Sequence, residues 1–413
     1  MDEKVILHSD MNCFYASVEM MLDPKLRGKA VAVCGSTEDR HGIVLAKSEL
    51  AKKRGVKTGM VNWEAIKCCP DLICVPPQYE QYLKYSKLAH QIYYRYTDLV
   101  EPFGMDECWL DVSSSGYIGG TGMEIAEKIR KAIREELGLT VSIGVSFNKI
   151  YAKLGSDLKK PDAITEISPQ NYKEKVWPLP ASDLLYVGPR TNEKLAEYGI
   201  KTIGDLAQSD PEFLRRLFGV RGVDIWKYAS GNDTSRVMHR DFVSPIKSVG
   251  HGITCTADLN DSEEVWKVML ELSQDVGHKL RVNELDATGV QICIRSNELW
   301  GKQYQGRLEA PTRSATEIAG VGRELFEKNY DWSTPVRAVT IRAIDLVPHS
   351  QPEQMNLFVD HARLERREKL ETAIESIRQR FGKKSIIQAA VMGDLKMPGD
   401  GRCEVIMPGL MYR

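Results

Sequence analysis

The chain has 413 residues, more than one hydrophobic core usually supports, so we expect about two to four domains. Its composition, 42% hydrophobic and 27% charged with a net charge of -1, excludes a disordered or fibrous protein, and leaves a nucleic-acid partner open. The sequence has no membrane-length apolar run, no signal-peptide pattern and no CxxC spacing among nine cysteines, which predicts a cytoplasmic protein without membrane association, zinc or disulfides.

The first 150 residues predict a small sheet with an insertion. KVILHSD is an apolar strand that ends at Asp10, FYASVEMML has helical spacing, and residues 13–76 form a compact insertion containing the lysine-rich run AKSELAKKRGVKTG. DLVEPF and CWLDVS are strands separated only by residues 104–107, which indicates a tight hairpin. A helix, MEIAEKIRKAIREEL, and an alternating strand, LTVSIGVS, follow. This order predicts a ferredoxin-like sheet with helices on one face.

The rest of the chain predicts a helical region, a second α/β region and a tail. LLYVGPRTNEKLAEYGIKTIGDLA indicates two short helices that flank a glycine turn. From about residue 242 to residue 347, strands such as ATGVQICIRS alternate with amphipathic helices such as SEEVWKVMLELSQDVGHKL. After the linker VPHSQPEQ comes a basic helix, RLERREKLETAIESIRQRFGKK.

Three acids mark the first candidate site. Asp10 ends the first strand, and Asp106 and Glu107 lie in the hairpin turn EPFGMDECWLD. The first strand of a ferredoxin-like sheet lies beside that hairpin, so the three carboxylates can converge at one edge of the sheet. Convergent oxygen ligands without a histidine or cysteine cluster suit Mg²⁺. Two such ions about 4 Å apart can clamp a phosphoryl transfer. The alternative interpretation is a turn with solvated acids.

Three motifs resemble the Y-family DNA polymerases, in particular their bacterial DNA polymerase IV-like group. They are HSDMNCFYASVE, EPFGMDECWLD and GVSFNKIYAKLGSDLKKP, and the resemblance covers nearly the whole chain. It implies an α+β, multidomain right-hand polymerase that performs translesion synthesis. The implied parts are a ferredoxin-like palm (1–12 and 77–166), fingers (13–76), a helical thumb (167–235), an α/β little finger (242–348) and a tail (349–413).

The resemblance also implies the catalytic residues. Asp10, Asp106 and Glu107 would bind two Mg²⁺ ions, with the main-chain carbonyl of Met11 as a further ligand. One ion would activate the primer 3′-hydroxyl and the other would hold the triphosphate of the incoming deoxynucleotide. Phe14, at a helix N-terminus, would receive triphosphate oxygens.

Tyr15 matches the aromatic residue that selects the sugar. Its ring would lie under the deoxyribose, where a 2′-hydroxyl would collide. The pattern alone also allows a core aromatic on the helix face of Phe14 and Val18.

Lys160 matches a lysine that contacts the triphosphate, with Lys159 as the alternative if the register differs by one residue. In the fingers of relatives, a tyrosine and an arginine grip the phosphates. Here Glu49 stands at the tyrosine position and Lys52 at the arginine position, where lysine keeps the charge but loses the bidentate fork. We expect Lys52 to bind nucleotide. Glu49 would be unfavourable near a triphosphate unless it turns away or pairs with Lys53, and no role is assigned to it. Gly104 stands where many relatives have serine.

Two regions are candidates for DNA binding. The thumb segment resembles a helix-hairpin-helix, in which Gly188, Arg190 and Thr191 would contact a phosphate, although Tyr186 stands where a first glycine is common. An ordinary helical turn is the alternative. In the little finger, basic residues lie on or near predicted strands, where one face could track the DNA backbone: Lys247, Arg295, Lys302, Arg307 and Arg342.

The pentapeptide QMNLF resembles the peptide that binds the bacterial sliding clamp. Gln354 would be a polar anchor, and three apolar side chains would enter a groove: Met355, Leu357 and Phe358. An amphipathic linker fragment is the default reading of five residues. The basic helix beyond it could lie on DNA, on the protein itself or in solvent.

These features predict a template-directed DNA polymerase with low fidelity and no proofreading, which acts on primer-template DNA and deoxynucleoside triphosphates as a monomer tethered to the sliding clamp. One alternative is a non-catalytic homologue that only binds DNA and the clamp. The presence of all three acids argues against it. A nucleotidyl cyclase shares the palm and the paired metals, but it needs neither the thumb hairpin nor the clamp peptide.

Overall fold

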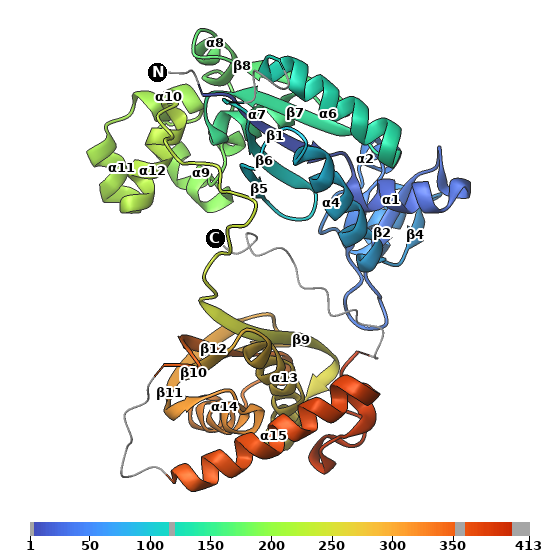
Figure 1. Ribbon diagram of the computed structural model, residues 1–413, viewed down its shortest axis with the longest axis vertical. Helices are drawn as coiled ribbons and strands as arrows, with labels where there is room; N and C mark the ends of the chain where they lie inside the picture. Colours follow the sequence, from blue (N-terminus) through green and yellow to red (C-terminus); the bar gives the residue numbers. More distant parts are fainter. Residues whose placement is uncertain (1–3, 115–119, 352–359, 399–413) are drawn as a thin grey trace. The chain divides into compact units, whose positions relative to one another are not determined.

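A computed structural model describes residues 4–114, 120–351 and 360–398 (Figure 1). The described residues form two compact units, one made of residues 4–35 and 43–244 and the other of residues 36–42 and 245–398. Each unit has its own hydrophobic core, as expected for a chain of this length. The two units are described separately.

The first unit is organised around a five-stranded sheet with the strand order β5-β6-β1-β7-β8. Its strands are β1 (Ile6–Met11), β5 (Val100–Pro102), β6 (Glu107–Asp111), β7 (Val141–Ser146) and β8 (Ile164–Ile167). The expected hairpin is present, because β5 and β6 pair in antiparallel register around residues 103–106. The helices that pack around this sheet are α1 (Phe14–Leu22), α4 (Tyr79–Tyr93), α6 (Gly122–Leu137) and α7 (Lys149–Leu158).

Helices cover both faces of this sheet, so the prediction of helices on one face is wrong. Leu7 and Leu110 lie in the same core as Ile129 of α6. Their strand neighbours, Ile6 and Trp109, point to the opposite face, where they pack with Ala152 of α7 (Figure 1). Strand β7 is buried along its whole length for the same reason.

Gly144, in the middle of β7, allows α7 to lie directly on the sheet. A Cβ atom at this position would lie 1.9 Å from the carbonyl oxygen of Ala152 and 2.6 Å from the backbone nitrogen of Ser156. No side chain fits between the strand and the helix, so this glycine sets how closely α7 approaches β1 and β7.

The insertion after α1 forms a second small sheet with the strand order β3-β2-β4. Its strands are β2 (Val31–Cys34), β3 (Val44–Lys47) and β4 (Ile73–Val75), and its helices are α2 (Glu49–Lys53), α3 (Asn62–Cys68) and the short η1 (Pro24–Leu26). Alanine, valine and cysteine side chains fill its core. The insertion thus has a small sheet and a core of its own.

A helical region follows β8 and shares α7 with the sheet. It contains α8 (Tyr172–Val176), η2 (Ala181–Asp183), α9 (Pro189–Glu197), α10 (Ile203–Gln208), α11 (Pro211–Phe218) and α12 (Val220–Ala229). Ile150, Tyr151 and Leu154 of α7 belong to its core. One helix therefore packs on the central sheet with one side and on the helical region with another.

The second unit is a four-stranded antiparallel sheet with the order β11-β10-β12-β9. Its strands are β9 (Ser248–Leu259), β10 (Leu285–Ser296), β11 (Gly301–Thr312) and β12 (Val336–Pro348). Helices α13 (Ser262–Val282) and α14 (Ala315–Asn329) cover one face and enclose the core of the unit. The basic tail helix, α15 (His361–Phe381), and two short turns, η3 (Lys383–Ser385) and η4 (Ala389–Val391), belong to the same unit.

Ion pairs attach α15 to the helical side of the second unit. Arg281 of α13 contacts Glu368 and Glu371 of α15 at 2.8 and 3.0 Å, and Arg313 contacts Glu368 at 2.7 Å. The helix contacts the unit with residues of both charges, because Arg367 of α15 also pairs with Glu317 of α14.

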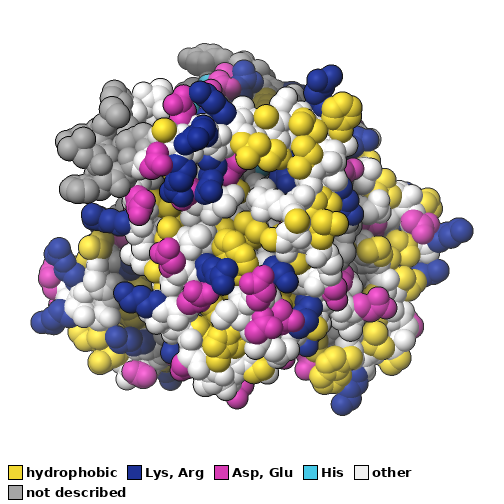
Figure 2. All heavy atoms as spheres, turned by 90° about the horizontal axis from the view of Figure 1, so that it is seen from below, with side chains coloured by type: hydrophobic (Ala, Val, Ile, Leu, Met, Phe, Trp, Pro, Cys, Tyr) yellow, Lys and Arg dark blue, Asp and Glu magenta, His cyan; other side chains and the backbone are white. Residues whose placement is uncertain are grey.

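The molecular face drawn in Figure 2 carries both signs of charge. Lysine and arginine side chains are interspersed with aspartate and glutamate, with apolar groups between them. A net charge near zero therefore arises here from mixed charges. Among the described residues, no helix is both long and apolar enough to span a membrane.

Candidate active site

Asp10 and Glu107 face each other across two neighbouring strands. Asp10 of β1 is the register partner of Glu107 of β6, so their side chains leave the sheet on the same face. His8 and Trp109 form the next pair on that face, and α7 covers it. Only about 5% of Asp10 is exposed. Two acids almost a hundred residues apart are thus brought together, as the sequence predicted.

Asp106 occupies the last position of the hairpin turn, directly before Glu107 begins β6. Its backbone carbonyl accepts a hydrogen bond from the amide of Met11 at 2.9 Å, which joins the turn to the end of β1. Gly104 has a φ of +93°, a conformation that residues with a Cβ rarely adopt. The glycine therefore suits the sharp turn that presents the two acids.

Two lysine ammonium groups lie among these acids. Lys153 Nζ lies 2.9 Å from Glu107 Oε2, 3.3 Å from Asp10 Oδ2 and 3.2 Å from Asp157 Oδ2. Lys160 Nζ lies 2.6 Å from Asp10 Oδ2 and 2.9 Å from Asp157 Oδ1. These contacts place Lys160 beside Asp10.

The environment moves the pKa values of the adjacent acids in opposite directions. Burial and the negative charges of Glu107 and Asp10 raise the pKa of Asp106 to about 7. Burial also opposes ionisation of Glu107, but the contact with His8 and the charge of Lys153 outweigh it and lower the pKa of Glu107 to about 2. The buried His8 itself has a lowered pKa because desolvation disfavours its charged form. Asp106 is therefore the acid that lacks a compensating cation.

Tyr15 lies at the start of α1, next to this cluster. Its ring stacks on Tyr82 of α4 with a centroid distance of 4.2 Å, and its hydroxyl donates to Met105 Sδ at 3.6 Å. Burial and the charge of Asp106 raise its pKa to about 12. Phe14 is almost fully buried, so its backbone is better placed than its ring to contact a ligand. Tyr15 is only partly buried, with one ring face packed against Tyr82.

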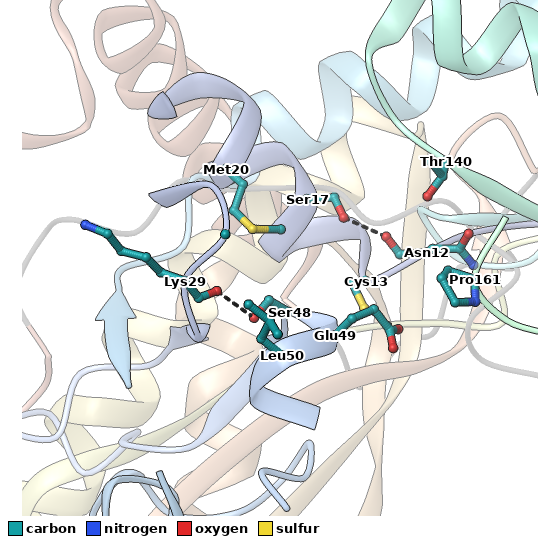
Figure 3. A pocket seen from close by; sticks show the side chains of 11 residues that line it. Asn12, Cys13, Ser17, Met20, Lys29, Ser48, Glu49, Leu50, Thr140 and Pro161 are labelled. Atoms are coloured by element: carbon teal, nitrogen blue, oxygen red, sulfur yellow. Dashed lines mark hydrogen bonds between the residues drawn. The ribbon is translucent and has the colours of Figure 1, made fainter. Parts of the chain in front are cut away.

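A cavity of about 240 Å³ lies between the start of α1, the start of α2 and Pro161 (Figure 3). Cys13 and Glu49 point toward each other at its side, and the Cys13 thiol donates to Glu49 Oε1 at 3.1 Å. Burial and this hydrogen bond raise the pKa of Cys13 to about 12. Lys52 Nζ is 3.9 Å from Glu49 Oε1, so the ion-pair partner of Glu49 is Lys52.

Two family profiles cover most of the described sequence. One, described as the impB/mucB/samB family, matches residues 9–157, and the other, its C-terminal domain, matches residues 246–357. The chain is 48% identical to "DNA polymerase IV" of Acetivibrio thermocellus over 95% of this chain and 98% of that protein. It is 37% identical to "DNA polymerase IV 1" of Bacillus subtilis over 94% and 93% of the two chains.

The chain belongs to the Y family of DNA polymerases, in its DNA polymerase IV group. It is a DNA-directed DNA polymerase of the translesion type. The fold agrees, because a solved structure, "Y-family DNA polymerase chimera Dbh-Dpo4(243-245)-Dbh", aligns with a TM-score of 0.75. That alignment covers 83% of this chain and 99% of the other at 23% identity. The predicted α+β right-hand polymerase fold is confirmed.

The acids of this polymerase fit a divalent cation by chemistry, although they are not a ready-made cage. Within the described residues, no three histidine, cysteine or acidic side chains group closely enough to hold a metal ion as they stand. Asp10 is instead paired with Lys153 and Lys160. Asp10 and Glu107 nevertheless both lie within 3.3 Å of one cationic nitrogen, so their oxygen atoms already surround a cation position.

Sequence reasoning missed the residues that α7 contributes. His8 Nδ1 and Ser156 Oγ are 2.9 Å apart, and Lys153 and Asp157 form an i, i+4 pair on the same helix. The usable signal was the spacing of Lys149, Lys153 and Asp157, which repeats every four residues in an otherwise apolar helix. From the sequence, no helix is predicted over these residues, and helices are expected on one face of the sheet only.

In the thumb, the start of α9 has the expected form. Gly188 is the N-cap residue, Pro189 is the first helical residue, and Gly188 and Arg190 are exposed. Backbone amides in the first turn of a helix have no partner within the helix, so those of Arg190 and Thr191 can face a ligand. Tyr186 has a φ of +72°, which explains why glycine is common at this position.

In the little finger, the predicted basic residues do not all share one face. Arg307 is opposite Gly289, which places it with Arg295 and Arg342 on the face that α13 and α14 leave open. All three of these arginines are exposed. Lys302 is opposite the buried Ile294, so it belongs to the helix-covered side, where its ammonium lies 5.2 Å from the ring centroid of Trp300. The expectation that Lys302 joins the open basic face is wrong.

Two other predictions concern the edges of this unit. Lys247 comes directly before β9, at the beginning of the sheet. The clamp peptide, from Gln354 to Phe358, lies outside the described residues. The role assigned to this peptide stays a prediction.

Proposed function

We propose that this polymerase adds deoxynucleotides to a primer 3′-hydroxyl by a two-metal phosphoryl transfer centred on Asp10, Asp106 and Glu107. The observation that carries the proposal is the register pair of Asp10 and Glu107, whose carboxylates share one cationic position beside the partly buried Asp106. Two Mg²⁺ ions, when bound there, would activate the primer oxygen and neutralise the charge that develops on the phosphates. The main-chain carbonyl of Met11, beside Asp10, is a proposed further ligand.

Residues around the acids would position the nucleotide. Lys160 already lies 2.6 Å from Asp10, so it can move to the triphosphate once a metal ion takes over the charge of that acid. Lys52 would bind the outer phosphates, and the backbone at Phe14 would present amides to them. We assign sugar selection to Tyr15, because its ring is fixed against Tyr82 and cannot easily withdraw from a 2′-hydroxyl.

DNA would be held by two separate elements. The amides at the start of α9, near Gly188, Arg190 and Thr191, suit one backbone phosphate. The open face of the little finger sheet, with Arg295, Arg307 and Arg342, suits a run of phosphates. Neither element reads bases, as expected of an enzyme that copies any template.

Several finer predictions complete the proposal. The polymerase would work as a cytoplasmic monomer with low fidelity and without proofreading. The peptide formed by Gln354, Met355, Leu357 and Phe358 would tether it to the sliding clamp. These finer predictions are supported by the resemblance of the sequence to the Y-family polymerases.

The decisive experiment is primer extension with Mg²⁺ and one template. We expect Asp106→Ala to reduce extension by roughly two orders of magnitude or more, because a buried carboxylate of the charge-stabilising centre is lost. Primer-template affinity, measured by fluorescence anisotropy, is expected to stay close to that of the wild type. Glu136→Gln, which alters an exposed glutamate paired with Arg95, is the control. Retained extension by Asp106→Ala would remove this acid from the catalytic centre.

A further inference from the structure

Lys153 is the most deeply enclosed cation of the catalytic cluster. Its side chain is 13% exposed, and its ammonium contacts Glu107 at 2.9 Å, Asp157 at 3.2 Å and Asp10 at 3.3 Å. Asp10 and Glu107 come from two adjacent strands and Lys153 from the helix that covers them. The ammonium therefore lies between the two acids that the proposed mechanism assigns to metal binding.

Two cations cannot occupy this position together. An ammonium group and a divalent ion a few ångström apart repel each other strongly in a buried site, where water screens charges weakly. The closest contact of Lys153 is to Glu107. A metal ion that binds both carboxylates must therefore displace the ammonium.

Asp157 offers the displaced ammonium a second partner. It lies one helical turn after Lys153, its side chain is 45% exposed, and it already contacts both Lys153 and Lys160. A rotation of the Lys153 side chain toward Asp157 keeps its charge paired and leaves Asp10 and Glu107 to the metal ion.

We propose that Lys153 is an internal counter-cation, which holds Asp10 and Glu107 together before metal ions bind and moves to Asp157 when they do. This inference rests on the proposed metal site. Lys153 is then a positioning residue with two effects. It stabilises the metal-free fold by separating two like charges, and it weakens metal binding because the ion has to displace it.

Lys149 provides a matched control on the same helix. It lies one turn before Lys153, its side chain is 10% exposed, and its ammonium contacts Glu101 at 2.7 Å. Lys149→Met and Lys153→Met thus each remove from the same helix one enclosed ammonium, which contacts Glu101 in the first case and Glu107, Asp10 and Asp157 in the second. Only the second change involves acids assigned to metal binding.

The test measures thermal unfolding of the full chain in chelator and in Mg²⁺, together with Mn²⁺ binding by calorimetry. In chelator, we expect Lys153→Met to lower the midpoint temperature of thermal unfolding by about 4 °C or more relative to the wild type. In Mg²⁺, we expect most of this difference to disappear. Mn²⁺ is expected to bind this variant about tenfold more tightly than the wild type, because no ammonium has to be displaced. Lys149→Met is expected to lose stability equally in both conditions and to bind Mn²⁺ as the wild type does.

Two results would overturn the inference. One is an equal loss of stability for Lys153→Met in chelator and in Mg²⁺, which would make Lys153 an ordinary buried ion-pair residue. The other is unchanged or weaker Mn²⁺ binding by that variant. The proposed function fails separately, through a wild-type chain that does not extend primers with Mg²⁺.

Discussion

Asp106 holds its proton more strongly in the folded chain than in the unfolded chain. Its pKa is raised to about 7 because it is buried next to two other acids. Mg²⁺ binding requires the ionised carboxylate, so a metal ion at this site has to compete with a proton near neutral pH.

The first prediction concerns pH in the absence of metal ions. A raised carboxyl pKa means that ionising Asp106 is less favourable in the folded chain than in the unfolded chain. The contribution of Asp106 to the free energy of unfolding therefore falls as pH rises from about 4 to about 7, and it is constant above pH 7. Asp106→Asn lacks this titration. We expect the difference in thermal midpoint, variant minus wild type, to increase from pH 5 to pH 7.5 in chelator. Parallel midpoint curves would contradict the assignment of this pKa to Asp106.

Glu49 stands where the family resemblance predicts a phosphate-binding tyrosine. It accepts a hydrogen bond from Cys13 and keeps Lys52 at 3.9 Å, so its charge partly offsets that lysine. From the sequence, Glu49 has no assigned role, and Lys53 is the residue with which it could pair. The actual partner, Lys52, lies one turn along α2 at i+3.

The second prediction is that Glu49→Gln improves nucleotide binding. The amide can still accept from the Cys13 thiol, while Lys52 regains its full attraction for a triphosphate. Because this pair is partly exposed, we expect KM for the deoxynucleotide to fall by only about two- to fivefold, with a small change in kcat. Glu64→Gln, on an exposed part of α3, is the control. An unchanged or raised KM would show that Glu49 does not restrain Lys52.

At the level of elements, the sequence predicted β1, α1, α6 and the β5–β6 hairpin, because their periodicity and the glycine turn are local signals. It missed that α7 covers the second face of the sheet. Ser142, Gly144 and Ser146 looked like the solvent side of β7, although all three are buried beneath α7 or beside β1. Small side chains at these positions allow the helix to pack closely on the strand. The alternation of polar and apolar residues cannot show whether such small residues are packed against a helix or exposed to solvent.

The same omission limited the predicted site. Asp10, Asp106 and Glu107 belong to strands and a turn, so the topology alone brought them together. Lys153 and Asp157 reach the site only because α7 lies over that face. Their positions depend on tertiary packing, which the sequence pattern did not reveal.

The third prediction separates the two faces of the little finger sheet. Arg307→Ala or Arg342→Ala, on the open face, is expected to weaken primer-template binding. Each is also expected to reduce, by about 1, the steepness of the slope of log affinity against log salt concentration. Lys302→Ala, on the helix-covered side, is the matched control and is expected to leave the slope unchanged. Affinities measured by anisotropy over a series of salt concentrations provide the slopes. Equal slopes for all three variants would rule out the open face as the DNA-binding surface.

At the scale of the whole molecule, the described residues divide into two compact units, and the proposed function assigns catalysis to the first and contact with the DNA backbone to the second. The tail helix belongs to the second unit, where Glu368 and Glu371 contact Arg281. Of the alternatives open for this basic helix, packing on the protein itself is the one observed. Basic residues of the helix take part in this packing as well, since Arg378 donates a hydrogen bond to Gln274 of α13.

The central claim is that Asp10, Asp106 and Glu107 together bind the catalytic metal ions. The most direct measurement is a crystal structure of the complex with primer-template DNA, a deoxynucleoside triphosphate and Mn²⁺, with the ions located by anomalous scattering. We predict two anomalous peaks in contact with these three carboxylates, and the Lys153 ammonium withdrawn toward Asp157. Peaks remote from Asp10, or carboxylates that turn to solvent without an ion, would contradict the account.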